Sequence, residues 1–311
     1  MKTTTIRSLA IAATSAALLL AASGCGSDTG SAGGDGELAG AQLTVGSKEF
    51  TESIILGQIT ALVFENAGAQ VTDQTGLQGS ATVREALMSK EIDIYWDYTG
   101  TGWVNILGNS SENLPEDLFA AVKEADAANG VAWLPPANFE NAYRLATSQA
   151  LAAEQALATT SEAAAFVGAN PGQGSICAAS EFINRDDGLP GLEAAYEFAF
   201  TEVVELDFNL IFTQVGTACQ FGEVFSTDAR IISNNLQVLD DDRNFFVPYQ
   251  GAATLRQETL DEHPAIADLL APVSQALTEP VITELNGKVD NDGERPRDVA
   301  KDWLTEQGLI G

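Results

Sequence analysis

Residues 43–95 read LTVGSKEFTESIILGQITALVFENAGAQVTDQTGLQGSATVREALMSKEIDIY, with short apolar runs set between longer periodic segments. Ile55, Ile59 and Val63 recur four residues apart, the spacing of one buried helix face. Ser80 begins a second periodic segment and is a candidate N-cap. The stretch therefore predicts strand, helix, strand, helix and strand, at 43–45, 51–67, 69–75, 80–90 and 92–95. Such alternation is typical of α/β layers.

The alternation continues, with a helix expected at 114–129 and a strand at 131–133. The pattern breaks at 135–141, where we place a crossing into a second lobe. We expect the chain to return through 230–239, and a last helix to begin near Pro296. A chain that leaves one lobe and comes back forms a two-stranded hinge beside a cleft. We therefore predict an α/β protein with two lobes, formed by 41–137 plus 230–311 and by 138–229.

The N-terminus has the composition of a secretory signal. An apolar run at 9–22 follows two cations and is shorter than the roughly 18 residues that a membrane-spanning helix needs. The sequence ASGC at 22–25 resembles a lipobox, with Ala at its first position in place of the usual Leu. We predict a signal peptide at 1–24, lipidation of Cys25 and a Gly/Ser-rich flexible tether at 25–40. The alternative is an ordinary cleaved signal with an incidental cysteine.

The chain is strongly acidic, with 44 Asp and Glu against 15 Lys and Arg and a formal net charge of −29. Phosphate binding requires clustered Lys and Arg, so this balance argues against nucleic acid and anionic lipid head groups as partners. The simplest explanation is the solubility of an exported protein. A Lys or Arg side chain that lies in a cleft of such an acidic chain is therefore a candidate for a binding role.

The cysteines also fit export. With Cys25 assigned to lipidation, Cys177 and Cys219 remain, and an even pair in an oxidising compartment predicts a disulfide. Two free buried thiols are the alternative. The only histidine is His263, and no CxxC spacing occurs, so we predict no metal site.

Several aromatic residues and cations spread along the chain would together suit one kind of ligand. They stand beside short polar motifs, and they are Tyr98, Tyr143, Phe225, Tyr249, Lys48 and Arg185. Aromatic faces attract a quaternary ammonium group, and Lys and Arg attract a carboxylate. One small zwitterion such as a betaine carries both groups. This set therefore predicts a solute-binding protein rather than an enzyme.

Six segments, in order, resemble motifs of the substrate-binding lipoproteins of ABC importers for quaternary-ammonium osmolytes, such as glycine betaine, carnitine and choline. They lie at 45–52, 79–101, 141–146, 181–192, 221–228 and 246–250. The most specific is IDIYWDYTGT at 92–101. The resemblance runs over nearly the whole chain after the tether. It implies a two-lobed fold like that of type II periplasmic binding proteins.

The resemblance also implies which residues bind the solute. In that family an aromatic cage holds the trimethylammonium group, and the matching positions are Tyr98, Tyr143, Phe225 and Tyr249. The carboxylate would lie near Lys48, Thr101 and Arg185. We expect Tyr98, Tyr249, Lys48 and Thr101 on the first lobe, and the other members on the second.

Two departures from the family pattern affect the site. Phe225 stands where Tyr is common; it keeps the π face and loses only the hydroxyl. Asn141 lies beside the cage, where an acidic residue can occur in relatives, so this site would be less anionic than theirs. Choline would leave Lys48 and Arg185 without a carboxylate, which favours betaine-like ligands.

These features predict an extracytoplasmic, lipid-anchored, monomeric receptor that closes its lobes around a quaternary-ammonium solute and delivers it to an ABC permease in the membrane. No cofactor is implied. The alternative within the binding class is another small zwitterion or cation, such as choline, an amino-acid betaine or a polyamine. An exported hydrolase is the enzyme alternative, and the absence of a GxSxG motif and of a histidine near a nucleophile argues against it.

Overall fold

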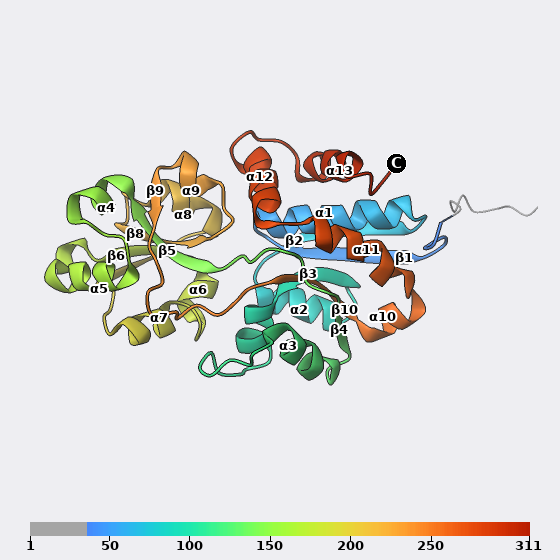
Figure 1. Ribbon diagram of the computed structural model, residues 1–311, viewed down its shortest axis with the longest axis horizontal. Coiled ribbons are helices and arrows are strands. Elements are labelled where there is room, and N and C mark those ends of the chain that lie inside the picture. The colour runs from blue at the N-terminus through green and yellow to red at the C-terminus, as the bar shows by residue number, and fades with distance from the viewer. Residues whose placement is uncertain (1–35) are drawn as a thin grey trace, which may run out of the picture. The chain divides into compact units, whose positions relative to one another are not determined.

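The structure is a computed structural model that describes residues 36–311. The predicted signal peptide, Cys25 and most of the predicted tether lie outside the described residues. Within the described part, the chain forms two five-stranded sheets with helices packed around them (Figure 1). Each sheet, with the helices around it, is called a lobe below.

The first sheet contains the strands predicted from residues 43–95. In spatial order its strands are β2 (Gln70–Leu77), β1 (Gln42–Lys48), β3 (Ile94–Tyr98), β10 (Gly251–Arg256) and β4 (Val131–Trp133). β1 pairs in parallel with β2 and β3, whereas β10 runs antiparallel to β3 and β4. The strand and helix alternation predicted for this stretch is therefore confirmed, with α1 (Thr51–Asn66) and α2 (Ser80–Met88) as its helices.

Helix α1 is buried on almost every side. Ile55, Leu56 and Phe64 are fully buried although they point in different directions around the helix. Such a helix must be covered on all faces, and α1 packs between β1, β2 and the C-terminal helices α11 (Ala265–Ala276), α12 (Glu279–Asp290) and α13 (Pro296–Glu306) (Figure 1). This placement carries Glu52, in the first turn of α1, into the protein interior.

The remaining helices of the first lobe cover the other part of its sheet. They are α3 (Leu118–Ala127), α10 (Gln257–Glu262) and a π-helix, η1 (Thr101–Ile106), that follows β3 directly. The predicted last helix begins at Pro296 and buries Val299, Trp303 and Leu304, as its periodicity indicated.

The second sheet has the strand order β7 (Glu202–Glu205), β6 (Ser175–Ala178), β8 (Phe221–Phe225), β5 (Tyr143–Ser148) and β9 (Leu236–Val238). Its helices are α4 (Gln149–Gln155), α5 (Thr160–Ala169), the 3-10 helix η2 (Pro171–Gln173), α6 (Ser180–Asn184), α7 (Leu189–Tyr196), α8 (Phe208–Gln214) and α9 (Arg230–Ser233). Cys177 of β6 and Cys219, two residues before β8, form a disulfide with a Cα–Cα distance of 5.6 Å.

The chain crosses between the sheets twice. The first crossing, between β4 and β5, falls at the predicted segment 135–141. The return was predicted too early: α9 and β9 precede it, β9 pairs with β5, and the chain reaches the first sheet only at β10. β9 belongs to the second sheet through its pairing with β5, and the sequence does not display which strand a segment pairs with. The two crossings lie side by side, because the amide of Asn141 donates to the carbonyl of Tyr249 at 3.0 Å.

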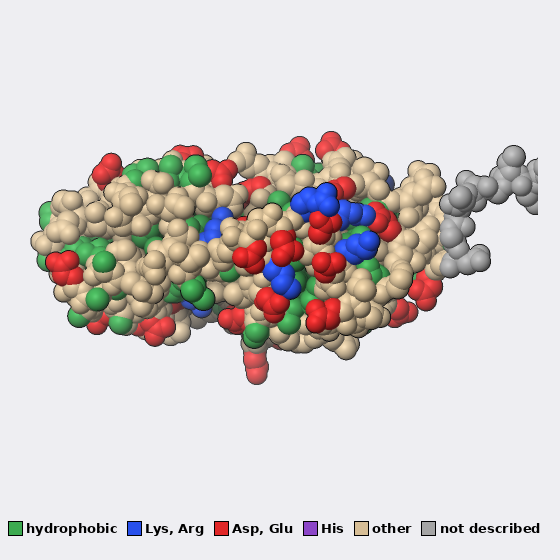
Figure 2. All heavy atoms as spheres, turned by 90° about the horizontal axis from the view of Figure 1, so that it is seen from above, with side chains coloured by type: hydrophobic (Ala, Val, Ile, Leu, Met, Phe, Trp, Pro, Cys, Tyr) green, Lys and Arg blue, Asp and Glu red, His purple; other side chains and the backbone are tan. Residues whose placement is uncertain are grey.

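The surface reflects the acidic composition. On the face shown in Figure 2, the Lys and Arg side chains gather over the C-terminal helices and have acidic side chains beside them. Such pairs include Arg297 with Glu65 and Lys288 with Glu284.

Among residues 36–311, no helix combines the length and the apolar character that crossing a bilayer demands.

Candidate functional site

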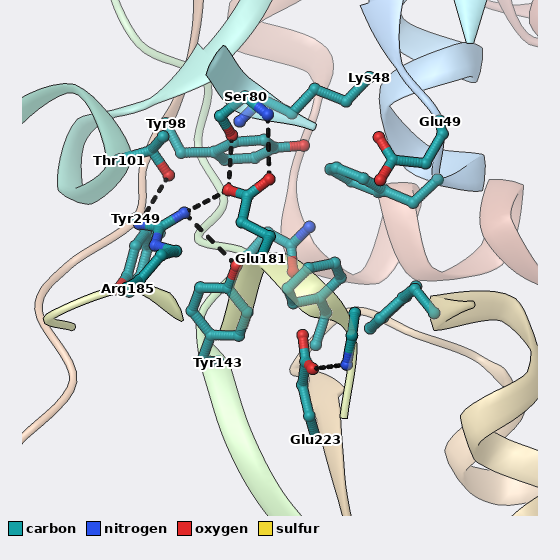
Figure 3. A pocket seen from close by; sticks show the side chains of 15 residues that line it. Lys48, Glu49, Ser80, Tyr98, Thr101, Tyr143, Glu181, Arg185, Glu223 and Tyr249 are labelled. Carbon is teal, nitrogen blue, oxygen red and sulfur yellow. Dashed lines mark hydrogen bonds and ion pairs between the residues drawn. The ribbon is translucent and has the colours of Figure 1, made fainter. Parts of the chain in front are cut away.

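A cavity between the two sheets brings together every residue predicted to contact the solute. Its lining includes Lys48, Tyr98, Thr101, Asn141, Tyr143, Arg185, Phe225 and Tyr249 (Figure 3). The cavity volume is about 40 Å³, whereas a single buried water needs roughly 10–15 Å³. The space therefore exceeds that of a lone structural water.

Strand ends place these side chains on both sides of the cavity. Lys48 ends β1, Tyr98 ends β3, Thr101 begins η1 and Tyr249 precedes β10, all in the first lobe. Tyr143 begins β5, Phe225 ends β8 and Arg185 follows α6, all in the second. Ligand sites of α/β proteins form at such strand ends. The residues that line the cavity thus come from both lobes.

The aromatic rings form a continuous cluster. The ring centroid of Tyr143 lies 5.0 Å from that of Phe225 and 5.6 Å from that of Tyr249, the latter pair being nearly perpendicular. Tyr98 connects to Phe225 through Phe50, at centroid distances of 6.1 and 5.1 Å. Burial raises the pKa of Tyr98, Tyr143 and Tyr249 well above the usual value, so their hydroxyls stay protonated.

Two further aromatic residues line the cavity and were not predicted. Phe50 follows Lys48 in the first motif, and Phe208 begins α8 with its ring centroid 4.3 Å from that of Phe225. Phe50 belongs to the first motif, within the sequence KEF, and this position could have identified it as a cavity residue. Phe208 lies outside all six motifs and carries no such signal.

Lys48 has a fixed acidic partner. Its Nζ donates to Oδ1 of Asp97 at 2.7 Å, and both side chains are buried. The same ammonium lies 5.0 Å from the centroid of the Tyr98 ring. An ammonium has three N–H donors, so Lys48 can hold Asp97 and still donate into the cavity.

Arg185 donates hydrogen bonds to more protein acceptors than Lys48 does. Its Nε and Nη2 donate to the carboxylate of Asp187 at 2.8 and 2.7 Å, and its Nη1 donates to Glu181 at 2.6 Å. The hydroxyl oxygens of Tyr143 and Thr101 accept longer bonds of 3.4 Å from the two Nη atoms. A guanidinium has five N–H donors, and each has a protein acceptor here. A ligand carboxylate could bind Arg185 only by displacing one of them.

Glu181 joins the lobes across this cavity. The amide and hydroxyl of Ser80 donate to its two carboxylate oxygens at 2.9 and 2.7 Å (Figure 3). Ser80 is the first residue of α2 and not its N-cap, which is Gly79, and its hydroxyl bonds Glu181 instead of its own helix. Burial alone would raise the pKa of Glu181, but the charges of Lys48 and Arg185 and the bonds from Ser80 outweigh it and lower that pKa. The carboxylate therefore remains ionised.

Other acidic side chains of the cavity were also missed. Glu49 and Glu223 line it together with Glu181. Glu181 and Glu223 belong to quoted motifs, but no role followed from the sequence because acids are abundant in this chain. The available signal was the alternation Glu223-Val224-Phe225, which puts the acid and the cage ring on one face of a strand.

The site offers π faces, the ionised carboxylate of Glu181 and two paired cations to a small molecule. Within residues 36–311, no cluster of three or more His, Cys, Asp or Glu side chains has the arrangement of a metal site. The arrangement suits the reversible binding of a small organic cation or zwitterion.

Comparison with known proteins gives a consistent result. Residues 41–306 match the family model described as the substrate binding domain of ABC-type glycine betaine transport systems. A glycine-betaine-binding protein of Pseudomonas aeruginosa is 34% identical over 277 residues, covering 86% of this chain and 88% of the relative.

Two further proteins are also similar to this chain. The ergothioneine transport permease/ergothioneine binding protein EgtU of Helicobacter pylori is 31% identical over 86% of this chain, which spans only 48% of that longer protein. The structure of apo YehZ from Escherichia coli is 29% identical, with a TM-score of 0.63 over 88% of this chain and 100% of YehZ.

Proposed function

Because the chain belongs to the family of substrate-binding domains of ABC-type glycine betaine transport systems, we propose that its own ligand is glycine betaine or a close quaternary-ammonium relative, held in the cavity between its lobes. The family consists of extracytoplasmic binding proteins of ABC importers for compatible solutes such as glycine betaine, choline and carnitine. It is a binding-protein family and not an enzyme family.

One observation supports this proposal most directly: four aromatic residues from both lobes meet in one cavity. Trimethylammonium is a bulky cation without N–H donors, so directional hydrogen bonds cannot recognise it. Faces of aromatic rings can, at roughly 0.5–2 kcal/mol each. We assign Tyr98 and Tyr249 of the first lobe and Tyr143 and Phe225 of the second to the cage. A cage divided in this way is complete only when the lobes close, so ligand binding favours closure.

The carboxylate of a betaine would bind near Lys48, Thr101 and Arg185. Lys48 has donors to spare beside its bond to Asp97. Arg185 can contribute a direct contact only if Glu181 or Asp187 gives up its place. Asn141 lies at the edge of the cavity, with its Nδ2 bonded to Glu52 at 2.8 Å.

The occupancy of Arg185 favours a second candidate. With its donors satisfied by the protein, the site has little unpaired positive charge for a ligand carboxylate. A cation that lacks a carboxylate, such as choline, would then bind at least as well as glycine betaine.

Calorimetric titration of the purified protein with glycine betaine, carnitine, choline and proline tests both candidates. Micromolar binding of a betaine with weaker choline supports the carboxylate contacts. Choline binding equal to or tighter than betaine binding favours the second candidate. Absence of binding by all four solutes contradicts the proposed ligand class.

Cage variants test the location of the site. Tyr98→Ala and Tyr143→Ala remove π faces and should each weaken binding at least tenfold, as expected for the loss of roughly 1.4 kcal/mol. Tyr143→Phe is the matched control, because it keeps the ring and loses only a long hydrogen bond of 3.4 Å. Unchanged affinity in both alanine variants would rule out the cage.

We also propose lipidation of Cys25, a monomeric state and delivery of the solute to a membrane permease. The lipobox-like sequence at 22–25 supports the anchor. Labelling of the protein with a radioactive fatty acid in cells, compared with a Cys25→Ser variant, tests it. Equal labelling of both proteins would contradict it.

A further inference from the structure

Glu223 is a buried acid for which neither the fold nor the cage assignment gives a reason. It lies on β8 two residues before Phe225, so both side chains are on the same face of the strand. Both line the cavity, and their cross-strand partners on β5 are Leu145 and Tyr143. The carboxyl group of Glu223 therefore lies next to the aromatic pair Tyr143 and Phe225. It is only 2% exposed.

The protein binds only one side of this carboxyl group. Its Oε2 accepts a hydrogen bond of 2.8 Å from the amide of Ala179. Within residues 36–311 its other oxygen accepts no hydrogen bond, and in Figure 3 that oxygen points toward the other side chains of the cavity. No Lys or Arg of residues 36–311 forms an ion pair with Glu223; the acidic partners of Arg185 are Glu181 and Asp187. An amide side chain could accept the Ala179 bond equally well, so this structural role does not require an acid.

Charges on α6, after α6 and after β1 act on this group. Glu181 from α6 and Glu49 from the segment after β1 repel a negative charge on Glu223, and Arg185 after α6 attracts it. Tyr143 of β5 stays neutral, since burial raises its pKa well above the usual value. Burial is the main cause that raises the pKa of Glu223 to about 8, and the two acids add to this effect. The hydrogen bond from Ala179 acts in the opposite direction. At neutral pH the group carries a proton unless a cation enters the cavity.

We propose that Glu223 is a further ligand-binding residue, which faces the quaternary-ammonium group in the cage and releases its proton to solvent when that cation binds. This inference rests on the proposed function, because it requires a cation between Tyr143 and Phe225. The carboxylate that forms supplies the counter-charge that aromatic rings alone lack. Binding of a cation and ionisation of Glu223 then favour each other, and affinity depends on pH.

The direction of the pH effect follows from linkage. Below pH 8 the incoming cation must displace a proton, and above it the carboxylate is already formed. Glycine betaine and choline should therefore bind up to about tenfold more tightly at pH 9 than at pH 7. At pH 7 the wild-type protein should release about one proton for each solute bound.

Two titrations test this coupling. The first measures the affinity of glycine betaine and of choline between pH 6 and 9. The second measures binding heats at pH 7 in buffers of different ionisation enthalpy, which gives the number of protons released. Glu223→Gln keeps an acceptor for Ala179 and should fold, which circular dichroism checks; it should lose both the pH dependence and the proton release. Glu202→Gln, an exposed acid on the edge strand β7 of the same sheet, is the matched control and should keep both.

The possible outcomes separate this inference from the proposed function. Binding that is independent of pH and releases no proton would overturn the role of Glu223 and leave the cage intact. Proton release that persists in Glu223→Gln would assign the coupling to another group and overturn the inference. If the wild-type protein binds neither solute, the proposed function fails and this inference fails with it. If Glu223→Gln does not fold, the absence of proton release from the wild-type protein would still overturn the inference.

Discussion

The hydroxyl of Tyr98 donates a 2.7 Å hydrogen bond to the buried carboxyl group of Glu52. The same carboxyl group accepts bonds from Thr227 at 2.6 Å, Asn141 at 2.8 Å and Asn286 at 3.3 Å. Asn141 lies on the first crossing between the lobes, and Thr227 on the loop that leaves β8. One group on α1 therefore links a cage ring of the first lobe to the first crossing and to the loop that follows β8 in the second lobe.

Replacing Glu52 by Gln should weaken both the fold and the site. Burial raises the pKa of Glu52, although its four hydrogen bonds favour the carboxylate. Gln keeps one acceptor oxygen and turns an NH₂ group toward donors, and each buried unpaired donor costs roughly 1–3 kcal/mol. We expect the free energy of unfolding to fall by about 2 kcal/mol or more, and solute affinity to fall because Tyr98 loses its support. Urea unfolding and calorimetric titration measure the two effects.

The control for this variant lies on the same helix. Glu65→Gln removes a partner of Arg297 at the surface, where an ion pair contributes roughly 0–1 kcal/mol. Equal losses of stability in Glu52→Gln and Glu65→Gln would show that the buried network contributes no more than an exposed pair.

The buried pair of Lys48 and Asp97 gives a second prediction. Lys48→Met leaves a fully buried Asp97 with only the hydroxyl of Tyr95 and the amide of Tyr98 as donors. Loss of one partner of a buried ion pair typically costs about 3–5 kcal/mol. We expect a loss of this size in urea unfolding. The double variant Lys48→Met/Asp97→Asn should recover a substantial part of it, since no unpaired charge remains buried.

Lys90→Met provides the comparison, because Lys90 pairs with Glu258 at an exposed position. It should change the free energy of unfolding by less than about 1 kcal/mol. If the double variant is no more stable than Lys48→Met, the loss comes from packing and not from the uncompensated charge.

Much of the fold could be predicted because its strongest signals are local. The period of Ile55, Ile59 and Val63 requires no knowledge of distant contacts. The break before β5 was visible for the same reason. The return crossing was placed too early because β9 belongs to the second sheet only through its pairing with β5, which the sequence does not display.

The site was predictable only in part. The cage positions came from motif order, and all of them line one cavity. The partners of the cations could not be predicted, because they depend on contacts between distant segments. Ser80 and Glu181 are 101 positions apart in the chain, and with 44 acidic residues no single Glu is conspicuous. Arg185 was expected to be free for a ligand, and the structure pairs it with Asp187 and Glu181.

The disulfide between Cys177 and Cys219 should stabilise the second sheet. It closes a loop with a sequence separation of 42 residues, for which chain entropy gives about 4 kcal/mol. Cys177→Ala/Cys219→Ala should lower the free energy of unfolding by roughly this amount. Adding dithiothreitol to the wild-type protein should produce a similar loss, and it should leave the double variant unaffected. A reductant effect on the double variant would point to a cause other than this bond.

The contact of Glu181 with Ser80 should hold the lobes together and disfavour a ligand carboxylate. The Glu181 carboxylate accepts two hydrogen bonds from Ser80 on the first lobe and one from Arg185 on the second. Glu181→Ala removes the link, so the radius of gyration from small-angle X-ray scattering should increase without ligand.

In Glu181→Ala the donors of Ser80 and Arg185 become free to bind a ligand carboxylate, and a hydrogen bond to a charged group contributes roughly 1.5–3 kcal/mol. The ratio of glycine betaine to choline affinity should rise at least about tenfold in this variant. Ser80→Ala keeps the backbone donor and should show smaller changes in the same direction. Unchanged scattering and an unchanged affinity ratio in Glu181→Ala would mean that this carboxylate neither links the lobes nor competes with the ligand.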